Sequence, residues 1–119
     1  MRRGVFVSYA RADGADIASR LVRDLGVAGI EAWLDRRELY GGLAWRRQIV
    51  DAIGEAAYLV LVLTPSALAS DVVAWEWQTA RRLGACVLPV RADPGVDTAL
   101  APRWMGLGNR SRLPIKRWR

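Results

Sequence analysis

The six-residue apolar run Tyr58–Leu63, with Thr64 and Pro65 directly after it, limits the possible folds of this chain more than any other stretch. Polar and apolar side chains do not alternate in this run, so a strand here would bury both of its faces. A central strand of a parallel sheet, with helices packed above and below it, has this pattern. A buried helix segment is the alternative, but the shortness of the run and its β-branched and aromatic content favour a strand, and Pro65 favours an extended residue before it.

Strand-like runs and amphipathic segments alternate along the rest of the chain. Further strands are expected at 4–9, 30–34 and 85–90, with a weak candidate at 113–115, and helices at 15–25, 43–57 and 71–83. Loops are expected at 10–14, where Asp13 could cap the first helix, and at 66–70. The connections are too long for hairpins, so this order predicts an α/β fold, a flavodoxin-like open parallel sheet with helices on both faces.

Length and composition indicate one domain over residues 1–119, with 52% hydrophobic residues available for a core. The single cysteine, Cys86, excludes an internal disulfide and lies in an apolar run, so we expect it in the core. The N-terminus does not resemble a signal peptide, and no apolar run approaches the length that spans a bilayer. We therefore expect a soluble, cytoplasmic domain without membrane contact.

Several kinds of chemistry are excluded by residues that the sequence lacks. It has no histidine, which excludes Ser-His, Cys-His and His-metal sites. The only lysine is Lys116, and no Gly-x-x-x-x-Gly-Lys loop occurs, which excludes a P-loop nucleotidase. Catalysis would have to use carboxylates, arginines, hydroxyls and backbone groups, and we expect no metal site and no bound cofactor.

The net charge of +6 comes from the end of the chain, because residues 98–119 carry six basic residues and no acid. Nucleic-acid binding is one interpretation of such a basic end. The segment has neither a basic stripe at helical spacing nor a nucleic-acid motif, so we expect none for this domain. A solvated tail, or a junction to a sensor domain outside this chain, explains the charge better.

One acid, Glu76, stands between Trp75 and Trp77 in the helix expected after the central strand. A helix that follows a strand and a short loop begins near the carboxyl edge of the sheet, where open α/β sheets bind ligands. Glu76 is therefore a candidate functional residue. The alternative is a solvated helix residue, although Glu76 has no basic partner four residues further on.

Three motifs in register resemble those of TIR (Toll/interleukin-1 receptor) domains, most closely the bacterial ones. They are Phe-Val-Ser-Tyr-Ala-Arg-Ala-Asp at 6–13; Asp35, then a loop ending in Gly42-x-x-Trp45; and an apolar strand ending in Thr64-Pro65, followed by Ser70 and then Glu76. The resemblance covers residues 4–90. It departs from the family at Val72 and Val73, where many TIR enzymes have Trp-Cys or a similar pair. Whether Trp75 or Trp77 takes over the aromatic role stays open.

The resemblance implies an NAD+ hydrolase (NADase) that cleaves the nicotinamide–ribose bond when TIR domains assemble, in bacterial anti-phage defence. Nicotinamide is cationic in NAD+ and leaves as a neutral molecule, so no acid is needed to protonate it. One carboxylate near the sugar can stabilise the oxocarbenium-like ribose electrostatically. Glu76 would have this role. The product could be linear or cyclic ADP-ribose, and NAD+ would be a substrate rather than a cofactor.

The resemblance also implies substrate-binding residues. Arg11 in the first βα loop could bind the pyrophosphate, since arginine is a good bidentate phosphate ligand, or could be a surface charge. Trp45 could stack on a ring of the substrate or anchor the core. Ser8 and Ser70 could supply hydroxyl contacts, and Ser70 could instead cap a helix.

The long loop after the second strand is implied as an assembly surface by the same resemblance. Its candidate residues are Arg36, Arg37, Glu38, Leu39 and Tyr40. In TIR enzymes a neighbouring domain's loop helps to complete the active site, so the implied partners are other TIR domains in an oligomer or filament. A plain solvated loop is the alternative.

Two other functions compete with the enzyme. A non-catalytic TIR adaptor, which binds other TIR domains, is favoured by the loss of the Trp-Cys pair and disfavoured by the retention of Glu76, Arg11 and Ser70. A receiver-like signalling domain would need clustered acids at the ends of its first strands to hold Mg²⁺. The first strand ends here in Ser8-Tyr9, so we discount that function.

Overall fold

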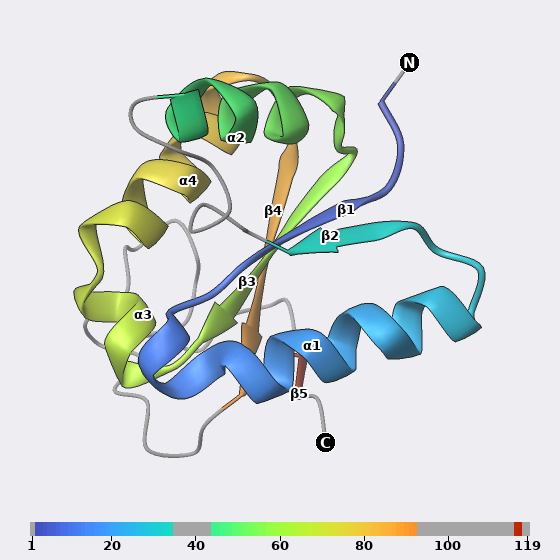
Figure 1. Ribbon diagram of the computed structural model, residues 1–119, viewed down its shortest axis with the longest axis vertical. Coiled ribbons are helices and arrows are strands. Elements are labelled where there is room, and N and C mark those ends of the chain that lie inside the picture. The colour runs from blue at the N-terminus through green and yellow to red at the C-terminus, as the bar shows by residue number, and fades with distance from the viewer. Residues whose placement is uncertain (1, 35–43, 93–115, 118–119) are drawn as a thin grey trace.

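Five parallel strands form one sheet in the order β2-β1-β3-β4-β5 in the computed structural model, which describes residues 2–34, 44–92 and 116–117 (Figure 1). The strands are β1 (Val5–Ser8), β2 (Ala32–Leu34), β3 (Tyr58–Leu63), β4 (Cys86–Arg91) and β5 (Lys116–Arg117). The helices are α1 (Arg11–Val27), α2 (Ala44–Glu55), α3 (Pro65–Ala69) and α4 (Asp71–Arg82). This strand order confirms the predicted flavodoxin-like open sheet.

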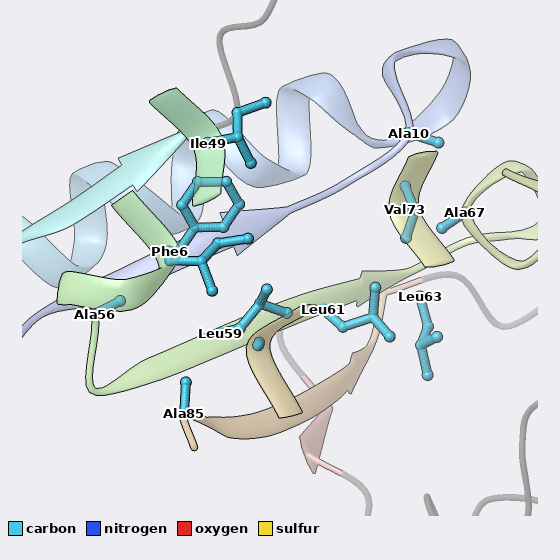
Figure 2. Close-up of a cluster of buried hydrophobic side chains, with 12 residues drawn as sticks. Phe6, Ala10, Ile49, Ala56, Leu59, Leu61, Leu63, Ala67, Val73 and Ala85 are labelled. Atoms are coloured by element: carbon cyan, nitrogen blue, oxygen red, sulfur yellow. The ribbon is translucent and has the colours of Figure 1, made fainter. Parts of the chain in front are cut away.

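The central strand β3 pairs with β1 on one side and β4 on the other, and both of its faces are buried as predicted. Leu59 and Leu61 pack with Phe6 of β1 in a core that α2 and α4 cover (Figure 2). Val60 and Val62 point to the opposite face, where α1 packs. α1 therefore lies on one side of the sheet, and α2 and α4 lie on the other (Figure 1).

The first helix begins earlier than its sequence pattern predicted. α1 starts at Arg11 rather than at residue 15, so the predicted loop at 10–14 is wrong. Asp13 is not the N-cap residue, because it lies in the first helical turn and the capping position is held by Ala10, whose side chain makes no capping bond. Asp13 instead accepts hydrogen bonds from the segment that follows β3. A carboxylate in the first turn is also favoured by the positive end of the helix dipole.

The segment after β3 is a helix, so the predicted loop at 66–70 is also wrong. Thr64 is extended and its side chain accepts a hydrogen bond from the backbone N–H of Ala67, while Pro65 is the first residue of α3. A capping threonine before a proline is a helix start, because proline has no N–H to leave unsatisfied there. Ser70 then ends α3 and caps α4, where its Oγ accepts from the backbone N–H of Val73.

Cys86 is exposed, which contradicts its predicted place in the core. In the register of β3 and β4, Cys86 lies opposite Tyr58, and Leu88 lies opposite Val60. Tyr58 and Leu88 are 45% and 41% exposed. These three residues lie on the α1 side of the sheet, and their exposure shows that the described helices do not cover them fully.

Two sequence expectations fall outside the described residues. They are the assembly loop at 36–40 and the weak strand at 113–115, whereas the fifth strand is found at Lys116–Arg117. No described helix is long and apolar enough to cross a membrane.

Because both faces of β3 are buried, shortening a side chain in this strand should strongly lower the free energy of unfolding. Leu61 is 1% exposed, so Leu61→Ala should lower the free energy of unfolding by roughly 2–5 kcal/mol through lost burial and a residual cavity. Leu88→Ala in the neighbouring strand is the matched control, because Leu88 is 41% exposed and should lose less than about 1 kcal/mol. Urea denaturation of both variants measures the difference. Equal losses would contradict this description of the core.

Candidate active site

The last residue of β1 and the middle of α4 meet in a buried polar contact. Ser8 Oγ donates a hydrogen bond of 2.6 Å to Glu76 Oε1, and both side chains are 0% exposed. Ser8 shares a strand face with Phe6, two residues earlier, so it points to the α2 and α4 side of the sheet. The contact joins residues 68 positions apart at the carboxyl end of β1.

Full burial of Glu76 contradicts its interpretation as a solvated helix residue. A carboxyl group is expensive to bury unless hydrogen bonds replace its lost hydration. The 2.6 Å hydrogen bond from Ser8 replaces part of that hydration. The hydrogen bond from the end of β1 therefore orients the Glu76 carboxyl group.

The aromatic residues near Glu76 belong to two packed helices. Trp45 in the first turn of α2 and Trp75 of α4 meet edge to face, with ring centroids 5.9 Å apart and planes at 83°. Both are half-buried and pack on the core cluster, as does Trp77. The core-anchor interpretation of Trp45 is confirmed. Trp75 is the aromatic residue that pairs with it, whereas Val73 is fully buried where the family often has a cysteine.

Arg11 and Ser70 lie at helix starts on the carboxyl edge of the sheet. Arg11 is the first residue of α1 rather than part of a loop, and it is exposed. Ser70 is half-buried and caps α4, which confirms the capping interpretation. A contact of Arg11, Trp45 or Ser70 with substrate stays a prediction. The five candidate residues of the assembly loop lie outside the described part of the chain.

A second polar cluster was missed by the sequence analysis. Thr64 is fully buried and donates a 2.6 Å hydrogen bond to Asp13 Oδ1, while the backbone N–H of Ser66 donates to Asp13 Oδ2 at 3.0 Å. The cluster ties the start of α1 to the end of β3. The Thr-Pro pair that caps α3 was visible in the sequence. The partnership with Asp13 was not, since it joins residues 51 positions apart.

These hydrogen bonds set the titration of Asp13. Desolvation is the largest single influence and would raise the pKa of Asp13, but the hydrogen bonds from Thr64 and Ser66 together outweigh it. The pKa of Asp13 is therefore below its usual value in the folded protein. Asp13 is exposed, so solvent screening limits the stability that its ionisation contributes.

A cavity of about 250 Å³ lies at the β2 edge of the sheet, and neither the Ser8–Glu76 pair nor the Asp13 cluster lines it. Residues of β2 and α2 line it, together with Phe6 and Val22. None of the residues proposed for substrate binding from the sequence lines this cavity, so it is not the candidate site.

The Ser8–Glu76 contact predicts an energetic coupling between the two residues. Ser8→Ala should lower the free energy of unfolding by about 1–3 kcal/mol, because it removes a hydroxyl that donates to a buried carboxyl oxygen. In a double-mutant cycle with Glu76→Gln, the two changes should couple by about 0.5–3 kcal/mol. Denaturant unfolding of the four proteins measures the coupling. Additive effects would contradict a direct contact.

The lowered pKa of Asp13 predicts a pH dependence of stability. Its ionised form is favoured by folding, so its contribution is complete above the unfolded pKa of about 3.9 and is lost as pH falls through the lower folded pKa. Asp13→Asn should therefore be less stable than the wild type at pH 7, and the difference should shrink below about pH 4. Asp16→Asn is the control, because Asp16 is exposed on the same helix and its side chain has no hydrogen bond to another described residue. A constant difference between pH 7 and pH 3 would count against the assignment.

Comparisons with known proteins bear on the family of this chain. A TIR domain family model matches residues 5–116, further than the sequence motifs reached. The NAD(+) hydrolase sarm1 of Drosophila melanogaster is 39% identical over 64 residues, or 54% of this chain. The aligned stretch is 5% of the length of that protein, so the chain corresponds to a small part of it.

Two solved structures have a similar fold. The TIR domain of the Toll-related receptor TRR-2 from Hydra magnipapillata gives a TM-score of 0.73 at 21% identity, over 98% of this chain and 84% of that chain. The TIR domains of the activated Roq1 resistosome, which directly recognises the pathogen effector XopQ, give 0.65 at 25% identity, over 76% and 58% of the respective chains. Because the family model spans most of its residues, this chain belongs to the TIR domain family.

Proposed function

We propose that this TIR domain is an NAD+ glycohydrolase that cleaves the nicotinamide–ribose bond, with Glu76 as the catalytic carboxylate. The observation that carries the proposal is the buried Ser8–Glu76 hydrogen bond, which holds one acid at the carboxyl end of β1. The similarity over 64 residues to a protein named as an NAD(+) hydrolase supports the same reaction.

The chemistry needs few groups. The C–N bond to nicotinamide breaks with its electron pair going to the nitrogen, which neutralises the cationic ring and leaves positive charge on the ribose. A carboxylate fixed beside the sugar stabilises that charge without having to move. Water, or a nucleophile within the same nucleotide, then attacks the ribose carbon and loses a proton, giving linear or cyclic ADP-ribose.

Full burial of Glu76 sets a condition on this reaction. A side chain that is 0% exposed does not touch a substrate, so the conformation described here has to open around Glu76 before catalysis. This requirement agrees with a domain that is inactive alone and active when assembled. We propose that contact with other TIR domains opens the structure around Glu76. We also propose that the domain is the effector part of a larger protein that acts in bacterial anti-phage defence.

A non-catalytic adaptor is the second candidate, and the same burial favours it. A carboxyl group that stays under α4 and hydrogen-bonded to Ser8 would stabilise the fold and never meet NAD+. In that case the domain would bind other TIR domains and have no chemical activity.

The deciding experiment measures nicotinamide release from NAD+ by purified protein that is clustered artificially, for example on vesicles through an affinity tag. Wild-type protein should release nicotinamide, and Glu76→Gln should lower the rate at least about 100-fold, because an oriented charge at a developing cation is worth that much. Chromatography of the products then distinguishes a hydrolase from a cyclase.

Two controls make the result interpretable. Glu55→Gln makes the same chemical change at an exposed position near the end of α2 and should keep the wild-type rate. Thermal unfolding must show that Glu76→Gln is folded at the assay temperature. If clustered wild-type protein releases no nicotinamide, the adaptor function is the correct one.

A further inference from the structure

The first turn of α2 carries two arginines and no acid. Arg46 and Arg47 both lie there, at the end of the helix where the peptide dipoles add to a partial positive charge. Cations at this position are electrostatically unfavourable. Arg81 and Arg82 of α4 differ, because they lie in the last turn, where the dipole favours them. The two arginines of α2 therefore need another explanation.

Arg46 is held by aromatic rings from two helices. Its guanidinium carbon lies 5.1 Å from the ring centroid of Trp45 and 5.5 Å from that of Trp75. Since the two indoles meet edge to face, the guanidinium lies in the corner between them. Cation–π attraction fixes the group in this position while the residue stays exposed. No acidic side chain within the described ranges forms an ion pair with it.

Trp45 and Trp75, which together clamp the Arg46 guanidinium, lie beside the candidate catalytic residue Glu76. Trp75 directly precedes Glu76 on α4, and α2 and α4 lie side by side on the same face of the sheet (Figure 1). Arg46 is exposed, so its N–H groups are accessible to a ligand, and the fork of a guanidinium matches two oxygens of a phosphate group.

We propose that Arg46, clamped by Trp45 and Trp75, binds the pyrophosphate group of a nucleotide at the rim of the site that contains Glu76. The clamp orders the arginine before the ligand arrives, so little conformational entropy is lost on binding. The negative charge of the pyrophosphate would also offset the two cations at the start of α2. This inference rests on the proposed function for the choice of a dinucleotide, and on the contacts of Arg46 for the binding group.

The test measures the binding of ADP-ribose, which keeps the pyrophosphate and lacks the bond that the proposed reaction breaks. Isothermal titration calorimetry at low salt would compare wild-type protein with Arg46→Gln and Arg47→Gln. Both substitutions remove one positive charge from the same exposed turn, and the contacts with the two indoles belong to Arg46. Arg46→Gln should weaken binding at least about tenfold, and Arg47→Gln less than about threefold.

The outcomes separate this inference from the enzyme proposal. Binding that depends on Arg46 supports the inference even if NAD+ is never cleaved. Unchanged binding by Arg46→Gln, equal weakening by both variants, or no saturable binding of ADP-ribose by the wild type at millimolar concentration would each overturn it, whether or not the clustered protein releases nicotinamide.

Discussion

The hydrogen bond from Ser8 Oγ to Glu76 Oε1 is the contact on which the rest of the site depends. It lies where β1 ends and under the middle of α4, so it fixes the height and rotation of the helix over the sheet. Trp75 is the neighbour of Glu76 on that helix, and its contact with Trp45 links α4 to α2. A buried carboxyl group is unfavourable without a donor, so the sheet, the helix and the aromatic pair are positioned together.

The burial of both faces of the sheet positions the residues of the candidate site. Phe6 and Ser8 point to one side of β1, and Val5 and Val7 to the other, so the strand supplies the core on both sides and the hydroxyl at its end. The hydrogen-bonded cluster of Asp13, Thr64 and Ser66 forms a second link at the same edge of the sheet. It joins the start of α1 to the end of β3. Two polar contacts at one edge thus tie the helices of both layers to neighbouring strands.

Features of this fold that depend only on residues close in the sequence were predicted correctly. The unbroken apolar run of β3, the amphipathic pattern of α2 and the cap at Ser70 all depend on nearby residues, and all were found. The start of α1 was predicted too late in the chain, because the partners of Asp13 come from a segment 51 residues away. Cys86 was wrongly expected in the core from its apolar neighbours alone, although burial in a strand depends on which helix covers that part of the sheet.

The candidate site has a buried part and an exposed part, and this difference bears on regulation. Glu76 is fully buried, whereas Arg46, one helix away and clamped by the neighbour of Glu76, is exposed. An anion can therefore meet Arg46 before the carboxylate is uncovered. Since Arg46 contacts Trp75 as well as Trp45, a ligand that pulls on the guanidinium acts on the same helix that keeps Glu76 against Ser8. The proposed binding at Arg46 and the proposed exposure of Glu76 would thus be connected through α4, and a substrate would favour the open state to the extent that it binds that state more tightly.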